Sequence, residues 1–149
     1  MPTKIFLDLE GTVIATWDDR VLCNIERVKS FLGDVKEVHI FSATIWDDKD
    51  KRTFAEEIKP ILEQVLEVSI MTWPSMEDVW RTTTWKGTRF ENVQEMIALI
   101  GKKRMFEDWC FQKEPPKTTC VLVDDMFGNT TLINEDLKIV VKTVDVNTL

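Results

Sequence analysis

Acidic and hydroxyl side chains follow three short apolar runs of the sequence. Asp8 and Glu10 come at the end of the first run, and Asp124 and Asp125 directly follow the last. Between them, another run ends in a hydroxyl-bearing triplet, Ser42, Ala43 and Thr44. Taken one at a time, such residues are typical of turns, helix caps and solvated loops. Their position after three separate apolar runs suggests chemistry instead.

Side chains two residues apart in a strand point to the same side of the sheet, so Asp8 and Glu10 are expected to lie side by side. If Asp124 and Asp125 end a strand of the same sheet, four carboxylates meet at one edge. They would repel one another unless a cation neutralised them. Mg²⁺ prefers such oxygen ligands and commonly also binds a substrate phosphate. The sequence therefore predicts a Mg²⁺ site formed by these four acids.

Five apolar runs predict the strands that must position these residues. Each is short and rich in Val, Ile, Leu or Phe, which is typical of strands covered on both faces. The runs are Ile5–Leu9, Val38–Phe41, Val68–Met71, Cys120–Val123 and Ile139–Val144.

Apolar residues recur every three to four positions between these runs, which predicts helices. The four stripes lie within Val21–Leu32, Phe54–Val65, Val93–Ile100 and Phe106–Cys110. Asp18 or Asp19 could cap the first helix, Pro60 should kink or restart the second, and Gly101 should end the third.

Strands that alternate with helices predict a doubly wound, Rossmann-like α/β fold with a mostly parallel sheet of about five strands. The 149 residues, 44% of them hydrophobic, are expected to form a single domain, residues 1–149. Ligands of such sheets bind at the carboxyl ends of the strands, which is where the acids and hydroxyls are expected.

Three of these segments together resemble motifs of the haloacid dehalogenase (HAD) superfamily of phosphohydrolases. FLDLEGT is similar to its first motif, DxDGT; HIFSAT to its second, a strand ending in Ser or Thr; and CVLVDD to its fourth, an apolar strand ending in paired acids. These segments span most of the chain. The resemblance implies a Mg²⁺-dependent phosphatase that hydrolyses phosphoric monoesters through an aspartyl-phosphate intermediate.

The resemblance also implies a role for each acid. Asp8 would be the nucleophile and a metal ligand, and Glu10 would be the general acid and base beside the metal. Most members have Asp where this chain has Glu10; Glu has the same chemistry and reaches one methylene further. Asp124 and Asp125 would complete the Mg²⁺ site, with Asp125 the more direct ligand.

The resemblance further implies contacts to the phosphate. The hydroxyl triplet would hydrogen-bond the phosphoryl oxygens, Ser42 above all, with Ala43 and Thr44 beside it. The family also uses a lysine that opens the helix before the fourth-motif strand. Lys103, at the start of KRMFEDW, fits that place best, and Lys102 and Lys86 are alternatives that the sequence does not separate. Lys86 is also a candidate substrate contact.

Many HAD proteins carry a cap domain inserted after the first motif or after the third strand. Neither interval of this chain is long enough for a full α/β cap, so a capless site is expected. An open site suits bulky or polymeric phosphorylated substrates, such as nucleotides, nucleic-acid ends or phosphoproteins. Small phosphorylated metabolites remain an alternative if subunits cover each other's sites, and the oligomeric state is open.

Composition narrows the class of protein. The net charge of −7 argues against a nucleic-acid coat protein, so nucleic acid is expected only as a substrate. One histidine and three scattered cysteines argue against a zinc site or a histidine-based triad. The cysteine count and the lack of a signal peptide or a long apolar run predict a cytoplasmic protein without membrane spans.

The segment Trp80–Arg104 stands apart, with six basic residues against two acidic ones. It is interpreted either as a solvated face or as a binding surface for an anionic substrate, to which Trp80 and Trp85 would add stacking.

Two other functions compete with the phosphatase. One is a non-catalytic binding module that keeps the acidic edge for a metal or partner. The other is a phospho-accepting receiver domain, which shares this fold class. Receivers place paired acids after the first strand and the acceptor after the third, and this chain shows the reverse order.

Overall fold

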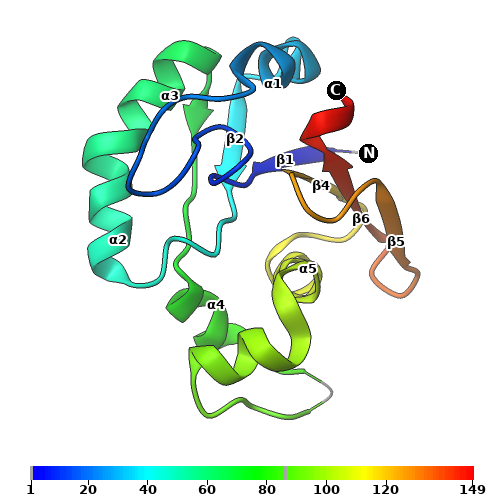
Figure 1. The fold of residues 1–149 in the computed structure, drawn as a ribbon. Helices are drawn as coiled ribbons and strands as arrows, with labels where there is room; N and C mark the ends of the chain where they lie inside the picture. The colour runs from blue at the N-terminus through cyan, green and yellow to red at the C-terminus, as the bar shows by residue number, and fades with distance from the viewer. Residues whose placement is uncertain (1, 86) are drawn as a thin grey trace.

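The computed structural model describes residues 2–85 and 87–149, and these residues form a six-stranded sheet with helices on both faces (Figure 1). The strand order is β3-β2-β1-β4-β6-β5, and every neighbouring pair is parallel except β5 and β6. The strands are β1 Thr3–Leu7, β2 Glu37–Ile40, β3 Ser69–Ile70, β4 Thr119–Asp124, β5 Thr130–Asn134 and β6 Ile139–Asp145. The predicted α/β class and mostly parallel sheet are confirmed, and the architecture is compatible with a Rossmann-like fold.

The pairing of β1 with β4 brings the two acidic segments together. The pairs run in register from Thr3 and Thr119 to Leu7 and Val123. The Asp8 amide then donates to the Val123 carbonyl oxygen at 3.0 Å, so Asp8 lies beside the end of β4. Because both strands run in the same direction, their carboxyl ends meet at one edge of the sheet.

One face of the sheet is covered by the helices between β1 and β3. They are α1 Ile25–Leu32, the π-helix η1 Phe54–Ile58 and α3 Lys59–Leu66 (Figure 1). The helix α2 Asp48–Thr53 leads into η1 and buries none of its residues. The buried side chains of α1, η1 and α3 pack against alternate residues of the central strands, such as Ile5 and Leu7. This alternation is the period-two pattern of a strand buried on both faces.

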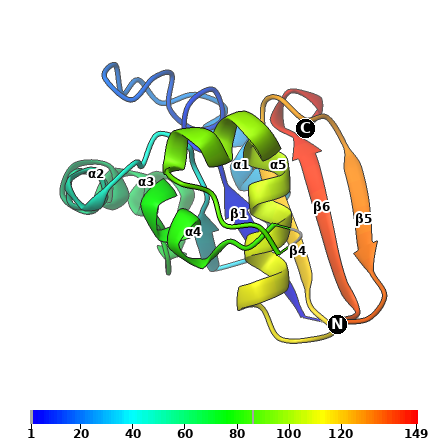
Figure 2. The ribbon, with the colours of Figure 1, turned by 90° about the horizontal axis from the view of Figure 1, so that it is seen from below.

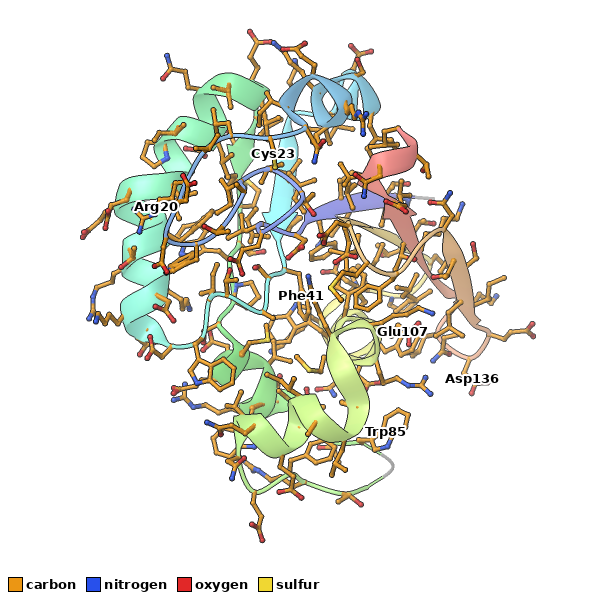
Figure 3. All side chains as sticks on the ribbon, in the orientation of Figure 1. Arg20, Cys23, Phe41, Trp85, Glu107 and Asp136 are labelled. Carbon is orange, nitrogen blue, oxygen red and sulfur yellow. The ribbon has the colours of Figure 1, made fainter. Side chains whose placement is uncertain are left out.

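The opposite face is covered by α4 Met76–Thr82 and α5 Val93–Lys113 (Figure 2). Phe6 points to this side, and its ring packs edge-on against Phe106 with 5.0 Å between centroids. Phe41, which follows β2, makes a similar contact with Phe106 at 5.1 Å and lies between the sheet and α5 (Figure 3). A short 3₁₀ helix, η2 Val146–Thr148, follows β6.

The helix predicted over Val21–Leu32 begins only at Ile25. Val21 is 60% exposed, and Leu22 forms an isolated antiparallel bridge with Ile14. The chain from residue 13 to residue 23 therefore folds back on itself instead of starting a helix. Apolar spacing alone does not distinguish these two outcomes over so few residues.

The predicted capping by Asp18 or Asp19 is accordingly wrong, because Asn24 is the residue that precedes α1. Its side-chain amide donates to the carbonyl oxygens of Gly11 at 3.3 Å and Thr12 at 3.2 Å. These two bonds hold the returning loop against the turn that follows β1.

The predicted helix over Phe54–Val65 is the middle of a longer helical run, from α2 through η1 to α3. Pro60 restarts the helix, as predicted, without ending the run. The Lys59 amide, just before Pro60, donates to the Phe54 carbonyl five residues back, the spacing of a π-helix. Since proline has no N–H to donate, the wider turn comes where an α-helical bond would be missing anyway.

Three elements were not predicted: α4, β5 and the short 3₁₀ helix η2. The helix α4 follows Ser75, whose hydroxyl accepts the Asp78 amide at 3.0 Å while the Asp78 carboxylate accepts the Ser75 amide at 3.0 Å. This capping box was visible in the sequence as Ser-x-x-Asp. The edge strand β5 has no apolar run, because its residues alternate between half-buried and exposed. The described residues thus form six strands, where about five were predicted.

None of the helices in the described residues combines the length and the apolar character needed to cross a membrane.

Candidate functional site

Asp8 lies buried just beyond β1, with only 6% of its surface exposed. Its Oδ1 atom is 2.6 Å from the Lys102 ammonium nitrogen, and its Oδ2 atom accepts a hydrogen bond from the Thr12 hydroxyl at 3.3 Å. Burial raises the pKa of the Asp8 carboxyl, and the neighbouring positive charge of Lys102 opposes that rise. The ion pair therefore favours the ionised form, which is the nucleophilic form of a carboxylate.

Lys102 bridges two carboxylates, because its ammonium nitrogen is also 3.1 Å from Asp124 Oδ2. It reaches them because α5 is broken at Gly101, whose φ of 73° and ψ of 165° are not helical. Gly101 was predicted to end a helix, and the structure confirms a break there. Lys102 is thus the first residue of the second half of α5, the half that leads back to β4.

Lys102, and not Lys103, is the lysine that contacts Asp8, which corrects the preference for Lys103. Lys103 is half-buried on α5, where its charge acts on the carboxyl of Glu107. Adjacent helical residues point about 100° apart, so only one of the two lysines faces the strand ends. Lys86, the third candidate, lies outside the described residues.

Asp124 and Asp125 extend the site from the end of β4. Asp124 Oδ1 accepts the backbone amides of Met126 at 2.6 Å and Phe127 at 3.2 Å, which fixes the side chain over the turn. Burial, followed by the charge of Asp124, raises the pKa of the Asp125 carboxyl. Two acids so close together favour a bound cation.

Gly11 makes room for Asp125. A Cβ atom built on Gly11 would lie 2.1 Å from Asp125 Oδ2, and the backbone φ of Gly11 is 76°. Only glycine therefore fits here without displacing the carboxylate. The glycine of the DLEGT segment has a packing reason as well as a conformational one.

The carboxylates of Asp8, Asp124 and Asp125 fit a hard cation. Each offers one oxygen, and the three oxygens lie within 4.8 Å of one another. Three oxygen ligands of negative charge suit Mg²⁺, which completes its shell with water and substrate. The predicted convergence of the first and last acidic segments is thus confirmed for three of the four acids.

Glu10 does not join this group in the described residues. Its carboxylate Oε2 instead accepts the Trp17 backbone amide at 2.8 Å, and its backbone forms an isolated bridge with Ile14. The prediction of Glu10 as a metal ligand is corrected on this geometry. Glu10 is not part of a regular strand, because β1 ends at Leu7, so the alternation that would align it with Asp8 does not apply.

The hydroxyl triplet follows β2, the other neighbour of β1. Ser42 is fully buried, and its oxygen lies 2.7 Å from the Thr44 hydroxyl oxygen. The Thr44 amide also donates to Ser42 Oγ at 3.3 Å, while Ala43 packs against the core on the α5 side. The Phe41 amide donates to the Leu7 carbonyl at 3.0 Å, which brings the triplet to the edge where Asp8 lies.

The aromatic residues of the Trp80–Arg104 segment pack against the core. The Trp80 indole donates to the Phe90 carbonyl at 3.0 Å, and Trp85 is half-buried beside α5 (Figure 3). The Arg104 guanidinium lies 4.3 Å from the centre of the Trp85 ring, so it covers this face of the indole. These contacts account for the tryptophans structurally, and substrate binding by this segment stays a prediction.

Fold and site together define the class: an α/β domain with a carboxylate cluster and a buried lysine at the carboxyl ends of parallel strands. No protein-family model, curated protein or solved structure matches the chain.

Proposed function

We propose that this protein is a Mg²⁺-dependent phosphomonoesterase that forms an aspartyl-phosphate on Asp8. The observation that carries the proposal is the Asp8 carboxylate, buried at the end of the central strand with Lys102 2.6 Å away and two further acids beside it. A buried carboxylate that is paired with a lysine and lies next to a cation site can act as the nucleophile in phosphoryl transfer.

In the first step, an Asp8 carboxylate oxygen attacks phosphorus as the bond from phosphorus to the leaving oxygen breaks. The protonated Glu10 gives its proton to that leaving oxygen, so an alcohol departs and Glu10 becomes a carboxylate. The Trp17 amide holds Glu10 through Oε2, and Oε1 carries the proton in this scheme. Lys102 stabilises the negative charge on the phosphoryl oxygens, and Ser42 donates a hydrogen bond to them.

In the second step, a water molecule attacks the phosphorus of the aspartyl-phosphate, and the Glu10 carboxylate accepts a proton from it. The bond between Asp8 and phosphorus breaks, which releases inorganic phosphate and restores the Asp8 carboxylate. Asp8, Asp124 and Asp125 would hold Mg²⁺, which supplies positive charge against the phosphoryl oxygens. The short intervals between the motifs favour an open site and bulky phosphorylated substrates.

The decisive experiment compares the wild type with Asp8→Asn in p-nitrophenyl phosphate hydrolysis with Mg²⁺. Asp8→Asn should show no turnover above background with an unchanged circular dichroism spectrum, while the exposed control Asp34→Asn should keep full turnover. A rapidly quenched reaction with p-nitrophenyl phosphate, radiolabelled in its phosphoryl group, should leave label on the wild type only, and hydroxylamine should release it, as expected of an acyl phosphate. Comparable turnover by Asp8→Asn would refute the proposal.

A second candidate is a non-catalytic cation-binding module on the same fold. The contact of Glu10 with the Trp17 amide favours it, because this bond engages one carboxylate oxygen of the residue that the phosphatase scheme uses as acid and base. Under this alternative the wild type binds Mg²⁺ in a calorimetric titration but neither takes up label nor hydrolyses any phosphate ester.

A further inference from the structure

A second hollow lies on the α5 face of the sheet, apart from the acidic site. Its volume is about 670 Å³, within the range of small-molecule sites. Its lining includes Phe6 on β1, His39 on β2, and the indoles of Trp73 and Trp109. None of the residues that line it belongs to the cluster around Asp8.

The hollow lies between α4 and the end of α5. The helix α4 has only seven residues, whereas α5 lies over the centre of the sheet (Figure 2). The segment Met71–Pro74 and the last turn of α5 line the hollow on either side.

Basic residues outnumber acidic ones around this hollow. The basic residues are Lys4, Lys51, Arg81 and Lys113, and the acidic ones are Asp78 and Glu114. Lys51 pairs with Asp78 at 2.8 Å, and Lys4 pairs with Glu114. Lys113 lies 5.1 Å from the centre of the Trp109 ring. Arg81 also pairs with Glu77 at 3.1 Å and lies 3.7 Å from Asp78. The residues that line the hollow carry an excess of two positive charges, or of one when Glu77 is counted with them. In a chain of net charge −7, this excess favours an anion at this place.

His39 contributes an aromatic surface to the hollow. Burial, together with the charge of Lys4, lowers the pKa of the His39 imidazole, so the ring is neutral at neutral pH. Its Nδ1 atom lies 2.8 Å from the Thr72 hydroxyl, and its ring centroid is 5.1 Å from that of Phe6. The exposed part of this aromatic pair is therefore the His39 ring, because Phe6 is only 1% exposed.

We propose that this hollow binds a small aromatic anion, with its ring against Trp109 and His39 and its acidic group near Arg81 and Lys113. The site is separate from the phosphatase site and does not depend on the proposed hydrolysis. Apolar walls with a few charged groups at the rim are the usual composition of a small-molecule site.

The test uses 1-anilinonaphthalene-8-sulfonate, whose fluorescence rises in apolar pockets, beside the uncharged N-phenyl-1-naphthylamine. The wild type should bind one sulfonate per chain saturably. It should bind the uncharged ring at least about fivefold more weakly. Arg81→Gln and Lys113→Gln should each raise the Kd of the sulfonate about two- to fivefold. Both side chains are exposed, so neither change should disturb folding.

Three further variants locate the site. Lys142→Gln, an exposed charge change on β6, should leave the Kd unchanged, and so should Asp8→Asn. Trp109→Leu should raise the Kd about tenfold, provided that its thermal unfolding matches the wild type. Equal affinity for the two probes, equal effects of Lys142→Gln and Lys113→Gln, or no saturable binding would overturn the proposal.

Discussion

Two adjacent lysines of α5 differ in what their side chains contact. Lys102 lies within 3.1 Å of both Asp8 and Asp124, whereas Lys103 faces Glu107. We expect Lys102→Met to lower kcat for p-nitrophenyl phosphate about 10²- to 10³-fold, the usual loss when one transition-state donor is removed. Lys103→Met is the matched control and should change kcat less than about threefold.

Steady-state kinetics of the two variants decide the assignment. Lys102→Arg keeps the charge and should recover part of the lost kcat, because a purely electrostatic role tolerates another cation. If Lys103→Met lost as much activity as Lys102→Met, the contacts of Lys102 would have no bearing on turnover.

Asp108 is a half-buried carboxyl on α5, and its buried Oδ2 atom has no hydrogen-bond partner among the described residues. Burial raises the pKa of Asp108 to about 6, with Arg104 opposing and Glu107 adding to the rise. Because the pKa is higher in the folded state than in the unfolded state, stability falls as pH rises from about 4 to about 6.

Asp108→Asn removes this ionisation. It should raise the free energy of unfolding by about 1 kcal/mol at about pH 7.5, after allowance for solvent screening, and by little at about pH 4.5. Urea unfolding at the two pH values measures the difference. Asp136→Asn, exposed in the β5–β6 turn, is the control (Figure 3). An equal gain at both pH values would attribute the effect to packing instead of charge.

At the scale of the element, the break in α5 decides what reaches the acidic site. Gly101 has a φ of 73° and a ψ of 165°, a conformation open almost only to glycine. A Cβ atom at this position would meet nothing within 4 Å, so the constraint comes from the backbone alone. Without the break, α5 would continue as one helix and carry Lys102 away from Asp8.

Gly101→Ala should therefore lower the free energy of unfolding by about 1–3 kcal/mol. It should also lower kcat, because Lys102 would no longer be held beside Asp8. Urea unfolding and phosphatase assays on the same preparation measure both. Gly33→Ala, at a position of positive φ that is also free of clashes, should lower stability without lowering kcat. Unchanged kcat in Gly101→Ala would show that the break does not position Lys102.

At the scale of the whole molecule, the acidic cluster should couple metal binding to stability. Three carboxylates within 4.8 Å repel one another until a cation binds, so saturating Mg²⁺ should raise Tm by a few degrees. EDTA should abolish activity without unfolding the protein, so its circular dichroism spectrum should stay that of the folded state. The two hydrophobic clusters that form the core do not involve the metal.

Thermal unfolding with and without Mg²⁺, followed by circular dichroism, measures this coupling. Asp125→Asn should reduce the response, since it removes one ligand and part of the repulsion. Gross unfolding on chelation, or full activity after it, would each contradict the expectation.

Local sequence patterns determined the strands and most of the helices. Buried strands such as β4 appear as continuous apolar runs, and Gly101 indicated a helix break because few other residues adopt its conformation. The same patterns did not predict the edge strand β5, and they wrongly placed Val21 in a helix. Half-exposed segments carry a weak apolar signal, and long-range pairing decides their conformation.

The sequence by itself determined that Asp8, Asp124 and Asp125 lie at strand ends, because an apolar run leads up to each pair of acids. Only the tertiary structure decided that β1 and β4 are neighbours, that Lys102 reaches Asp8, and that Glu10 turns to the Trp17 amide. Each of these depends on strand order, on the direction of a helix after a break, or on a returning loop. Such features arise from contacts between distant residues, which one-dimensional spacing does not encode.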